Sequence, residues 1–462
     1  WILVKVAIIG AGKLGYKLAE LMILEDIDVT LVDKNPRVLE RINEHIDVLT
    51  VEGNGIDIKL LKNIGISSCD LLVATTDSDE TNTVICALAK KLGCKFNIAR
   101  IRKPEYRRQL DFIKTELGID HIVNPDLDTA KWIEKYLLKQ YIYHTTDFVS
   151  GKVRIIDYYI GYNSYFSGKK VKDLEGLDNL LIAAISRDGN IIIPHGSTEI
   201  QQDDVMYIIG ENKNIDTFKE RFNLSTVDKE IENVMIVGGS NIGYYLSESL
   251  AKQRIAVKLI EQDKSRAEEL SNKLENVLVI HGDGTDINLL EEEMLSGMDA
   301  FIGTTGFDEQ NLLMALMAKQ AGVNNSLAKI SRENYAKLID RLEIDAAINP
   351  IYVTASNILK HIRGGKVISV SLLIGGDGEV TELIVGKNSP FINKPLAELN
   401  LPKGIIIGTI VRDGKVIIPK GDSIIRADDR IIVFCLNEDT PTLKQFFSPK
   451  KGGILSELWN RN

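Results

Sequence analysis

An internal duplication constrains the fold of this chain more than any other feature. Residues 75–82 read TTDSDETN and recur as TTGFDEQN at 304–311, with an offset of 229 residues. Residues 187–194 read RDGNIIIP and recur as RDGKVIIP at 412–419, with an offset of 225 residues. Near-constant offsets over most of a chain indicate two copies of one half-length unit. The 462 residues also exceed one ordinary core, and size scaling predicts roughly three or four compact units.

Each half contains two kinds of segment. Between residues 4 and 136, continuous apolar strands alternate with amphipathic helices, which indicates a parallel sheet covered on both faces. Residues 151–210 contain short strands joined by tight glycine turns, which indicates a small, largely antiparallel module. The same order returns in the second half. We predict an α/β protein, a tandem duplication of a Rossmann-like doubly wound parallel sheet followed by a small α+β module. The predicted units are residues 1–136, 137–225 (a linker helix and the first small module), 231–360, 361–440 and a C-terminal tail, 441–462.

Composition narrows the functional classes. Hydrophobic residues make up 44% and charged residues 26% of the chain, a profile typical of soluble globular proteins. No apolar run approaches the roughly 18–20 residues that span a bilayer, and the opening residues lack the features of a signal peptide. The net charge of −9 argues against nucleic acid as a partner. The four cysteines and six histidines show no zinc-site spacing, so we expect a reducing cytoplasm and no metal site.

A glycine loop in the first half has the dinucleotide fingerprint G-x-G-x-x-G. Residues 8–15 read IIGAGKLG, directly after an apolar strand and at the start of an amphipathic helix. Gly10 permits the tight turn, Gly12 lets a pyrophosphate approach the backbone, and Gly15 brings the helix against the strand. The helix amino terminus supplies free N–H groups and partial positive charge. Asp33 ends the next strand, where a carboxylate accepts hydrogen bonds from a ribose and favours NAD(H) or an adenine nucleotide over NADP(H).

Further polar residues follow the later strands of this sheet. Asn54 lies in a Gly-Asn-Gly turn after the third strand, Thr75, Thr76 and Asp77 follow the fourth, and Arg100 ends the fifth. Carboxyl ends of parallel strands line the ligand crevice of such sheets, so these residues are candidates for contacts with adenine, ribose and phosphate. The alternatives are turn and helix-cap roles for the loops and a salt bridge for Arg100.

The second half carries an altered copy of the glycine loop. Residues 236–243 read IVGGSNIG, which retains Gly238 and Gly243 but has Ser240 at the middle glycine position. The acidic strand end is retained as Glu261. Because Ser240 adds a Cβ where a pyrophosphate should nearly touch the backbone, we expect weakened or altered binding; its hydroxyl could instead donate to a phosphate.

The duplicated order of Rossmann unit and small module resembles the TrkA family, the peripheral cytoplasmic subunits of bacterial Trk potassium uptake systems. In that family, paired RCK (also called KTN) domains are each followed by a TrkA-C module. The resemblance covers about residues 4–440. It rests on IIGAGKLG with Asp33, on GNGID and GDGTD, on TTDSDETN and TTGFDEQN, and on the paired RDGxxIIP segments.

The resemblance implies ligands, partners and location. Members of the family bind NAD(H), ATP or ADP in the Rossmann clefts and assemble into homo-oligomers, either dimers or tetrameric rings. They dock on an integral-membrane potassium-translocating subunit of the TrkH, TrkG or KtrB type and gate it, which would place this chain in the cytoplasm, peripheral on the inner face of the cell membrane. Cyclic di-AMP binds the TrkA-C modules of some relatives.

The resemblance also implies two sets of nucleotide-binding residues and no catalytic residue. Lys329 stands where the first half has an arginine, so a single ammonium group replaces a guanidinium that can form two parallel hydrogen bonds. The residues of the first set are Gly10, Ala11, Gly12, Lys13, Leu14, Gly15, Asp33, Lys34, Asn54, Thr75, Thr76, Asp77 and Arg100, and those of the second are Gly238, Ser240, Asn241, Ile242, Gly243, Glu261, Asp283, Thr304, Thr305 and Lys329.

The alternative function is an NAD-dependent oxidoreductase. Such an enzyme needs a proton donor or acceptor beside the nicotinamide, and His121 and His281 look isolated in the sequence. The small modules are also short for a catalytic domain. A transcription repressor is a third possibility, but no basic helix-turn-helix segment is evident. We therefore expect a nucleotide-responsive regulator rather than an enzyme.

Overall fold

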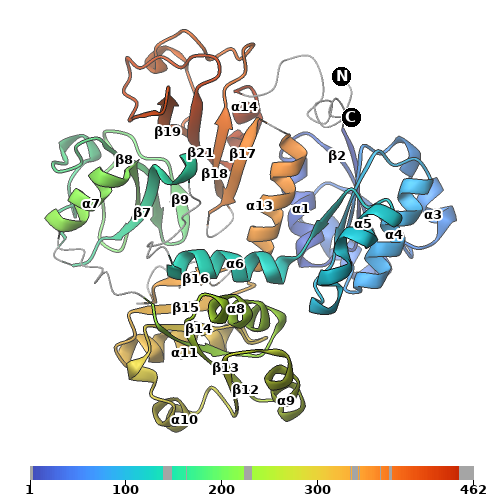
Figure 1. Cartoon of the computed structure of the whole chain (residues 1–462). Helices are drawn as coiled ribbons and strands as arrows, with labels where there is room; N and C mark the ends of the chain where they lie inside the picture. Colours follow the sequence, from blue (N-terminus) through green and yellow to red (C-terminus); the bar gives the residue numbers. More distant parts are fainter. Residues whose placement is uncertain are drawn as a thin grey trace.

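The computed structural model describes residues 4–138, 148–162, 164–222, 231–332, 335, 342, 344–364, 366–373 and 377–446. It contains two parallel six-stranded sheets and two antiparallel sheets (Figure 1). This confirms the predicted α/β fold class. None of the helices described in these ranges is long and apolar enough to cross a membrane.

The first parallel sheet forms the first Rossmann unit, residues 4–123, with strand order β3-β2-β1-β4-β5-β6. Its central strand β1 is buried on both faces, because Val6, Ala7, Ile8 and Ile9 all lie in the core. Such burial is what continuous apolar strands predict. Its strands are β1 (Lys5–Ile9), β2 (Asp28–Asp33), β3 (Leu49–Glu52), β4 (Leu71–Ala74), β5 (Phe96–Arg100) and β6 (His121–Val123), and its helices are α1 (Lys13–Ile23), α2 (Pro36–Asn43), α3 (Ile58–Asn63), α4 (Asp79–Lys91) and α5 (Leu110–Glu116).

The second Rossmann unit, residues 231–348, repeats this topology with strand order β13-β12-β11-β14-β15-β16. In both units the first strand pairs in parallel with the second and the fourth, which places the glycine loop in the crevice between the two halves of the sheet. Its strands are β11 (Asn233–Val237), β12 (Ala256–Glu261), β13 (Val277–His281), β14 (Ala300–Gly303), β15 (Asn325–Lys329) and β16 (Ala346–Ile348), and its helices include α8 (Asn241–Lys252), α9 (Lys264–Lys273), α10 (Ile287–Glu292) and α11 (Asp308–Gln320).

The two small modules are antiparallel sheets that pack face to face. Asp188 and Gly189 both have positive φ, 51° and 75°, and Asp413 and Gly414 repeat these values, so each RDG segment forms a tight hairpin turn. Val153, Ile155 and Ile209 of the first module share a hydrophobic core with Val380, Ile432 and Phe434 of the second. The first module contains β7 (Val153–Tyr159), β8 (Leu180–Arg187), β9 (Asn190–Ile192), β10 (Val205–Glu211) and α7 (Asn212–Arg221), and the second contains β17 (Val367–Leu372), β18 (Gly378–Ile384), β19 (Ile405–Arg412), β20 (Lys415–Ile417), β21 (Arg430–Leu436) and α14 (Thr440–Lys444).

Two helices, α6 (Pro125–Leu138) and α13 (Pro350–Arg363), exchange between the halves. Each follows the last strand of one Rossmann unit and packs on the other (Figure 1). Ala130, Ile133 and Leu137 of α6 lie in the core of the second unit. Helix α13 lies in the core of the first unit, against α1, and also packs on β17 of the second module. Both helices begin with proline, which suits the first helical position because its missing N–H would have no partner there.

A buried cluster of charges joins the first Rossmann unit to the second module. Arg363, the last residue of α13, pairs with Glu25 after α1 at 2.6 Å and with Glu379 of β18 at 2.6 Å. Lys444 of α14 lies 3.3 Å from Glu25. Burial alone would raise the pKa of Glu25, but Arg363 and Lys444 hold it below its usual value. The last turn of α13 therefore fixes the position of the second module on the first unit.

Candidate nucleotide clefts

The first glycine loop contains two glycines that the fold itself requires. Gly10 has a φ of 107°, and an added Cβ would lie 2.7 Å from the backbone nitrogen of Thr76. A Cβ on Gly15 would lie 1.9 Å from the carbonyl oxygen of Gly10. Gly12 differs, because its backbone is extended and nothing lies within 4 Å of an added Cβ. A glycine at position 12 is therefore not needed for folding, and the space beside it is open for a ligand.

Asp33 lies where the fingerprint predicts, at the end of β2 and against the loop. Its Oδ2 accepts the N–H of Ala11 at 2.7 Å, and its Oδ1 accepts the N–H of Asn35 at 2.9 Å. Each carboxylate oxygen retains a further lone pair for a ribose hydroxyl. Lys34 is exposed beside it. The carboxylate thus orients the loop and has capacity left for a ligand.

The predicted threonines have structural hydrogen bonds. Thr75 Oγ1 donates to the carbonyl oxygen of Gly10 at 2.9 Å, and Thr76 Oγ1 donates to Asn82 Oδ1 at 2.7 Å. The side chain of Asn54 accepts from the N–H of Ile56, as in a turn. Asn82 of α4 also donates to the carbonyl of Arg100, so it ties the loops after β4 and β5 together. Sequence reasoning missed Asn82, although it ends the repeated motif TTDSDETN and its copy Asn311 makes the same contacts.

A cavity of about 340 Å³ lies between the two Rossmann units, and residues of both halves line it. The first half contributes Lys13, Arg100 and Arg102, and the second half contributes Lys329. Leu14 and Ile242 also reach this cavity, although both side chains are largely buried in the two cores. The sequence had assigned Arg100 and Lys329 to separate sites, whereas the structure brings them to one.

The positive charge in this cavity is incompletely neutralised. Burial and the neighbouring Arg102 lower the pKa of Arg100, and Asp77, at 3.7 Å, only partly opposes this. Burial and Lys13 likewise lower the pKa of Lys329, against the opposing effect of Asp308. The buried Nε atoms of Arg100 and Arg102 have no hydrogen-bond partner within the described ranges. Cations that destabilise one another in a partly buried cavity favour an anionic ligand.

Asp126 is the carboxylate at the second-unit side of this cavity. It accepts a hydrogen bond from Asn241 Nδ2 at 3.1 Å, which joins α6 to the second glycine loop. Burial raises the pKa of Asp126. Tyr245 of α8 donates to the carbonyl of Arg102 at 2.9 Å. The second loop therefore directs Asn241 toward the first unit.

The second glycine loop has the same backbone as the first. Gly238 has a φ of 107°, and a Cβ on Gly243 would lie 2.1 Å from the carbonyl oxygen of Gly238. The backbone of Ser240 is extended, like that of Gly12. The Ser240 hydroxyl donates to the carbonyl of Thr304 at 2.9 Å and accepts the N–H of Gly243 at 3.4 Å. The Ser240 hydroxyl, which could have donated to a phosphate, thus already makes hydrogen bonds within the protein.

The second crevice is a separate cavity of about 310 Å³. Glu261 repeats the role of Asp33, accepting the N–H of Gly239 at 2.6 Å and that of Asp263 at 2.8 Å. Asp283 lines the cavity and accepts from Thr285, whose hydrogen bonds lower the pKa of Asp283. Thr305 also lines it, and Thr304 Oγ1 donates to Gly238 as Thr75 does to Gly10.

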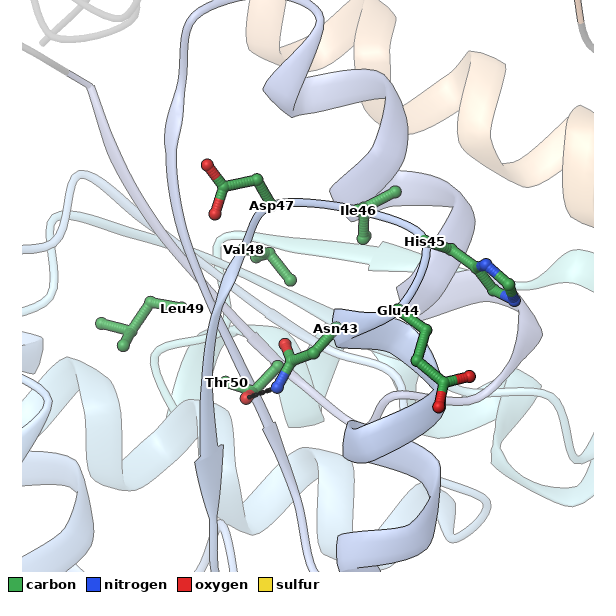
Figure 2. Close-up of a pocket in the computed structure, with 8 residues that line it drawn as sticks. All are labelled: Asn43, Glu44, His45, Ile46, Asp47, Val48, Leu49 and Thr50. Carbon is green, nitrogen blue, oxygen red and sulfur yellow. Dashed lines mark hydrogen bonds between the residues drawn. The ribbon is translucent and has the colours of Figure 1, made fainter.

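A third hollow, of about 540 Å³, lies beside residues 43–50 (Figure 2). The single loop 43–50 outlines it, and Asn43 Nδ2 donates to Thr50 Oγ1 at 2.9 Å. This loop precedes β3 and so lies at the amino end of the strand, opposite the edge that carries the glycine loops. None of the predicted site residues lies there.

Together these features define a class: a duplicated protein with two Rossmann units, an open crevice at each glycine loop and two antiparallel modules. The TrkA-N domain family matches residues 6–125 and 234–350, and the TrkA-C domain family matches residues 155–223 and 380–448. The chain belongs to the TrkA family of potassium uptake proteins, as the motifs predicted.

Full-length relatives and solved structures agree with this assignment. Trk system potassium uptake protein TrkA homolog 1 of Methanosarcina mazei is 33% identical, over 96% of this chain and 100% of that protein. The Haemophilus influenzae protein TrkA is 34% identical, over 96% of this chain and 99% of that protein. A GsuK channel bound to NAD shares the fold with a TM-score of 0.53 at 18% identity, over 96% of this chain and 79% of that one. A GsuK structure bound to ADP shares the fold with a TM-score of 0.50 at 15% identity, over 78% of this chain and 69% of that one.

Members of this family regulate potassium transport and are not enzymes, so the oxidoreductase alternative is set aside. One expectation used against the oxidoreductase alternative was wrong. His121 is not isolated, because its ring lies against that of His361 on α13, with 3.8 Å between the ring centroids. The two histidines are far apart in the sequence, and the exchange of α13 between the halves brings them together.

Proposed function

We propose that this chain is the nucleotide-sensing subunit that gates a membrane potassium uptake system. Its first cleft would bind NAD(H), ATP or ADP, with the ribose on Asp33 and the phosphates over Gly12 and the amino end of α1. The names of the GsuK structures, which report bound NAD and bound ADP, support this ligand class for the shared fold.

The cavity between the units is the observation that carries the proposal. Phosphates that leave the first glycine loop would enter a space lined by Lys13 and Arg100 from one half and Lys329 from the other. A ligand held by both halves has unequal affinity for their possible orientations, and so it shifts the equilibrium between them. Helices α6 and α13 each pack on the opposite Rossmann unit, and α13 also packs on β17, which gives such a shift a route to the second module.

The partner proposed for this movement is an integral-membrane potassium-translocating subunit of the TrkH, TrkG or KtrB type, contacted by a homo-oligomer at the inner face of the membrane. The family names of the relatives support a Trk partner. Cyclic di-AMP on the modules stays a prediction.

The test measures binding and its consequence separately. We expect ADP, ATP or NADH to raise the melting temperature of the intact chain by several degrees, since a ligand that binds only the folded state stabilises it. The variant Asp33→Ala should lose most of that shift and, in vesicles containing the membrane subunit, the nucleotide dependence of potassium flux. Nucleotide binding that leaves flux unchanged, or no binding at all, would refute the proposal.

A further inference from the structure

Tyr245 is a buried tyrosine of the second half whose hydroxyl contacts the backbone of the first half. It lies in the second turn of α8, which packs along α6 (Figure 1), and it is 1% exposed. The hydroxyl donates to the carbonyl of Arg102 at 2.9 Å and accepts from Asn124 Nδ2 at 3.2 Å. Burial raises the pKa of Tyr245 to about 12, so the hydroxyl keeps the proton that it donates. Tyr245 thus links the second unit to the segment that follows β5.

The duplicated fold does not require a tyrosine at this position. Lys17 lies at the equivalent point of α1 and is also buried, and it pairs with Glu20 of its own helix at 2.7 Å. A buried polar group needs a hydrogen-bond partner. Tyr245 has its partners, Arg102 and Asn124, across the boundary between the two units. This link is therefore specific to the residue at position 245.

Arg102, the residue that Tyr245 contacts, lines the cavity between the units. Its own unit holds its amide side, because Asp79 Oδ2 accepts the N–H of Arg102 at 2.9 Å and that of Lys103 at 2.8 Å. Tyr245 holds the carbonyl side from the other unit. The peptide group between Arg102 and Lys103 is thus held at its N–H by one half and at its C=O by the other. Together these contacts fix the direction in which the side chain of Arg102 leaves the backbone.

The guanidinium of Arg102 has donors left for a ligand. Its Nη2 donates to the carbonyl of Asp77 at 3.4 Å, and its buried Nε has no hydrogen-bond partner within the described ranges. A guanidinium offers five N–H donors in a planar fork that suits the oxygens of a phosphate. An arginine whose backbone is already fixed loses less conformational freedom when it binds a ligand, which raises its contribution to affinity.

We propose that Tyr245 is a positioning residue for the first nucleotide cleft: through the backbone of Arg102, it holds the guanidinium where it binds the phosphates of the nucleotide. Tyr245 does not line the cavity, so it acts without touching the ligand. The inference rests on the proposed function and deepens it. It makes phosphate binding in a cleft of the first half depend on a helix of the second half, α8.

The ADP affinity of Tyr245→Phe, measured by isothermal titration of the intact chain, tests the inference. The relevant site is the one that Asp33→Ala weakens. We expect a loss of only roughly fivefold, the effect of one hydrogen bond, because Asn124 Nδ2 still donates to the carbonyl of Arg102 at 3.3 Å. Tyr244→Phe is the matched control, since it removes a hydroxyl from the neighbouring residue of α8 and should bind ADP like the wild type. Equal ADP affinity in Tyr245→Phe and the wild type would overturn the inference.

A double-mutant cycle with Arg102→Gln distinguishes positioning from general support of the fold. Arg102→Gln should lower ADP affinity roughly tenfold, and the addition of Tyr245→Phe should lower it by less than about twofold more, since the guanidinium that Tyr245 positions is gone. The same cycle applies to ATP or NADH if either binds more tightly than ADP.

The outcomes of this cycle separate the inference from the proposed function. If Tyr245→Phe lowers the affinity of Arg102→Gln as much as that of the wild type, Tyr245 acts by another route. Unchanged affinity in Arg102→Gln would show that Arg102 does not bind the phosphates. Either result overturns the inference and leaves the proposed function standing, whereas a wild-type chain that binds none of ADP, ATP and NADH would refute both.

Discussion

The two glycine loops share a backbone but not a chemistry. Gly12 and Ser240 are both extended, with φ values of −67° and −60°, and each precedes a helix at the same point of the sheet. The outer glycines are kept in both halves, because an added Cβ would collide with backbone atoms. The middle glycine is kept only in the first half, where nothing in the protein lies within 4 Å of an added Cβ. Two glycines that the fold requires are thus distinguished from one that it does not require.

The two exchanged helices differ in a similar way. Helix α13 ends in Arg363, which is buried between Glu25 and Glu379, whereas α6 ends in Leu138, which is 43% exposed. The core of the first Rossmann unit continues through α13 into the second module. Among the described residues, the core of the second unit takes in α6 but no strand of the first module. The first unit is therefore the one that is tightly connected to a module.

Removal of Arg363 should have the largest effect on stability. Arg363→Leu copies the residue of the other helix and leaves Glu379 buried without a cation and Glu25 with Lys444 alone, at a cost of about 3–5 kcal/mol. Urea unfolding should show this as a clear fall of the midpoint. Leu138→Ala is the matched control at the end of α6, and a surface substitution there should stay within about 1 kcal/mol. Equal effects of the two variants would remove this difference between the halves.

The histidine pair should make the first half more sensitive to acid than the second. Burial, together with His361 and Lys114, lowers the pKa of His121 from 6.5 to about 4, and burial also lowers that of His361. Between these pH values the unfolded state binds more protons, so stability is full above about pH 6.5 and declines as the pH falls toward 4. The melting temperature should drop by several degrees over that interval.

The equivalent positions of the other half are Ala346 and Tyr136, neither of which titrates in this range. The double variant His121→Ala with His361→Tyr should therefore flatten the melting profile between pH 6.5 and 4. A profile as steep as that of the wild type would show that other groups whose pKa is lowered in the folded state, such as the ion-paired Glu25 and Glu248, dominate.

Conversion of the first loop into the second should change binding without changing stability. In Gly12→Ser the new Cβ meets no protein atom, so the melting temperature of the unliganded chain should stay within a degree or two. ADP affinity should fall roughly tenfold, about 1.4 kcal/mol. Gly15→Ala is the contrasting variant and should destabilise the chain, since its Cβ would lie 1.9 Å from a backbone oxygen. Unaltered ADP affinity in Gly12→Ser would contradict this account of the loop.

The reverse conversion should have the smallest effect. Ser240→Gly removes the Cβ and the hydroxyl that bonds to Thr304, but Asn241 and Lys329 keep their contacts within the protein. We expect only a few-fold gain in ADP affinity at the second crevice, measured by titration in the Asp33→Ala background. No gain would mean that Ser240 does not limit phosphate binding, and a gain as large as the loss in Gly12→Ser would mean that Ser240 alone does.

Much of the fold could be predicted from the sequence, because the repeated motifs and the apolar strands are short, continuous segments. Gly10 and Gly15 make the close backbone approaches that their spacing predicted, and Asp33 ends β2 as predicted. The shared cavity was not predicted, because it depends on how the two units face one another and on the exchange of α6 and α13. Arg102 and Asp126 lie outside the repeated motifs, so nothing local marked them.

The central claim is that residues of both halves hold the phosphates of one nucleotide. The most direct test is the ADP affinity of Lys329→Gln, because Lys329 belongs to the second half and the predicted ligand lies in the first. Glutamine can still donate to the carbonyl of Thr305, so the melting temperature of the unliganded chain should hold. We predict a roughly tenfold loss of ADP affinity, the size expected when a charge-assisted hydrogen bond is removed. An ADP affinity equal to that of the wild type would contradict the claim.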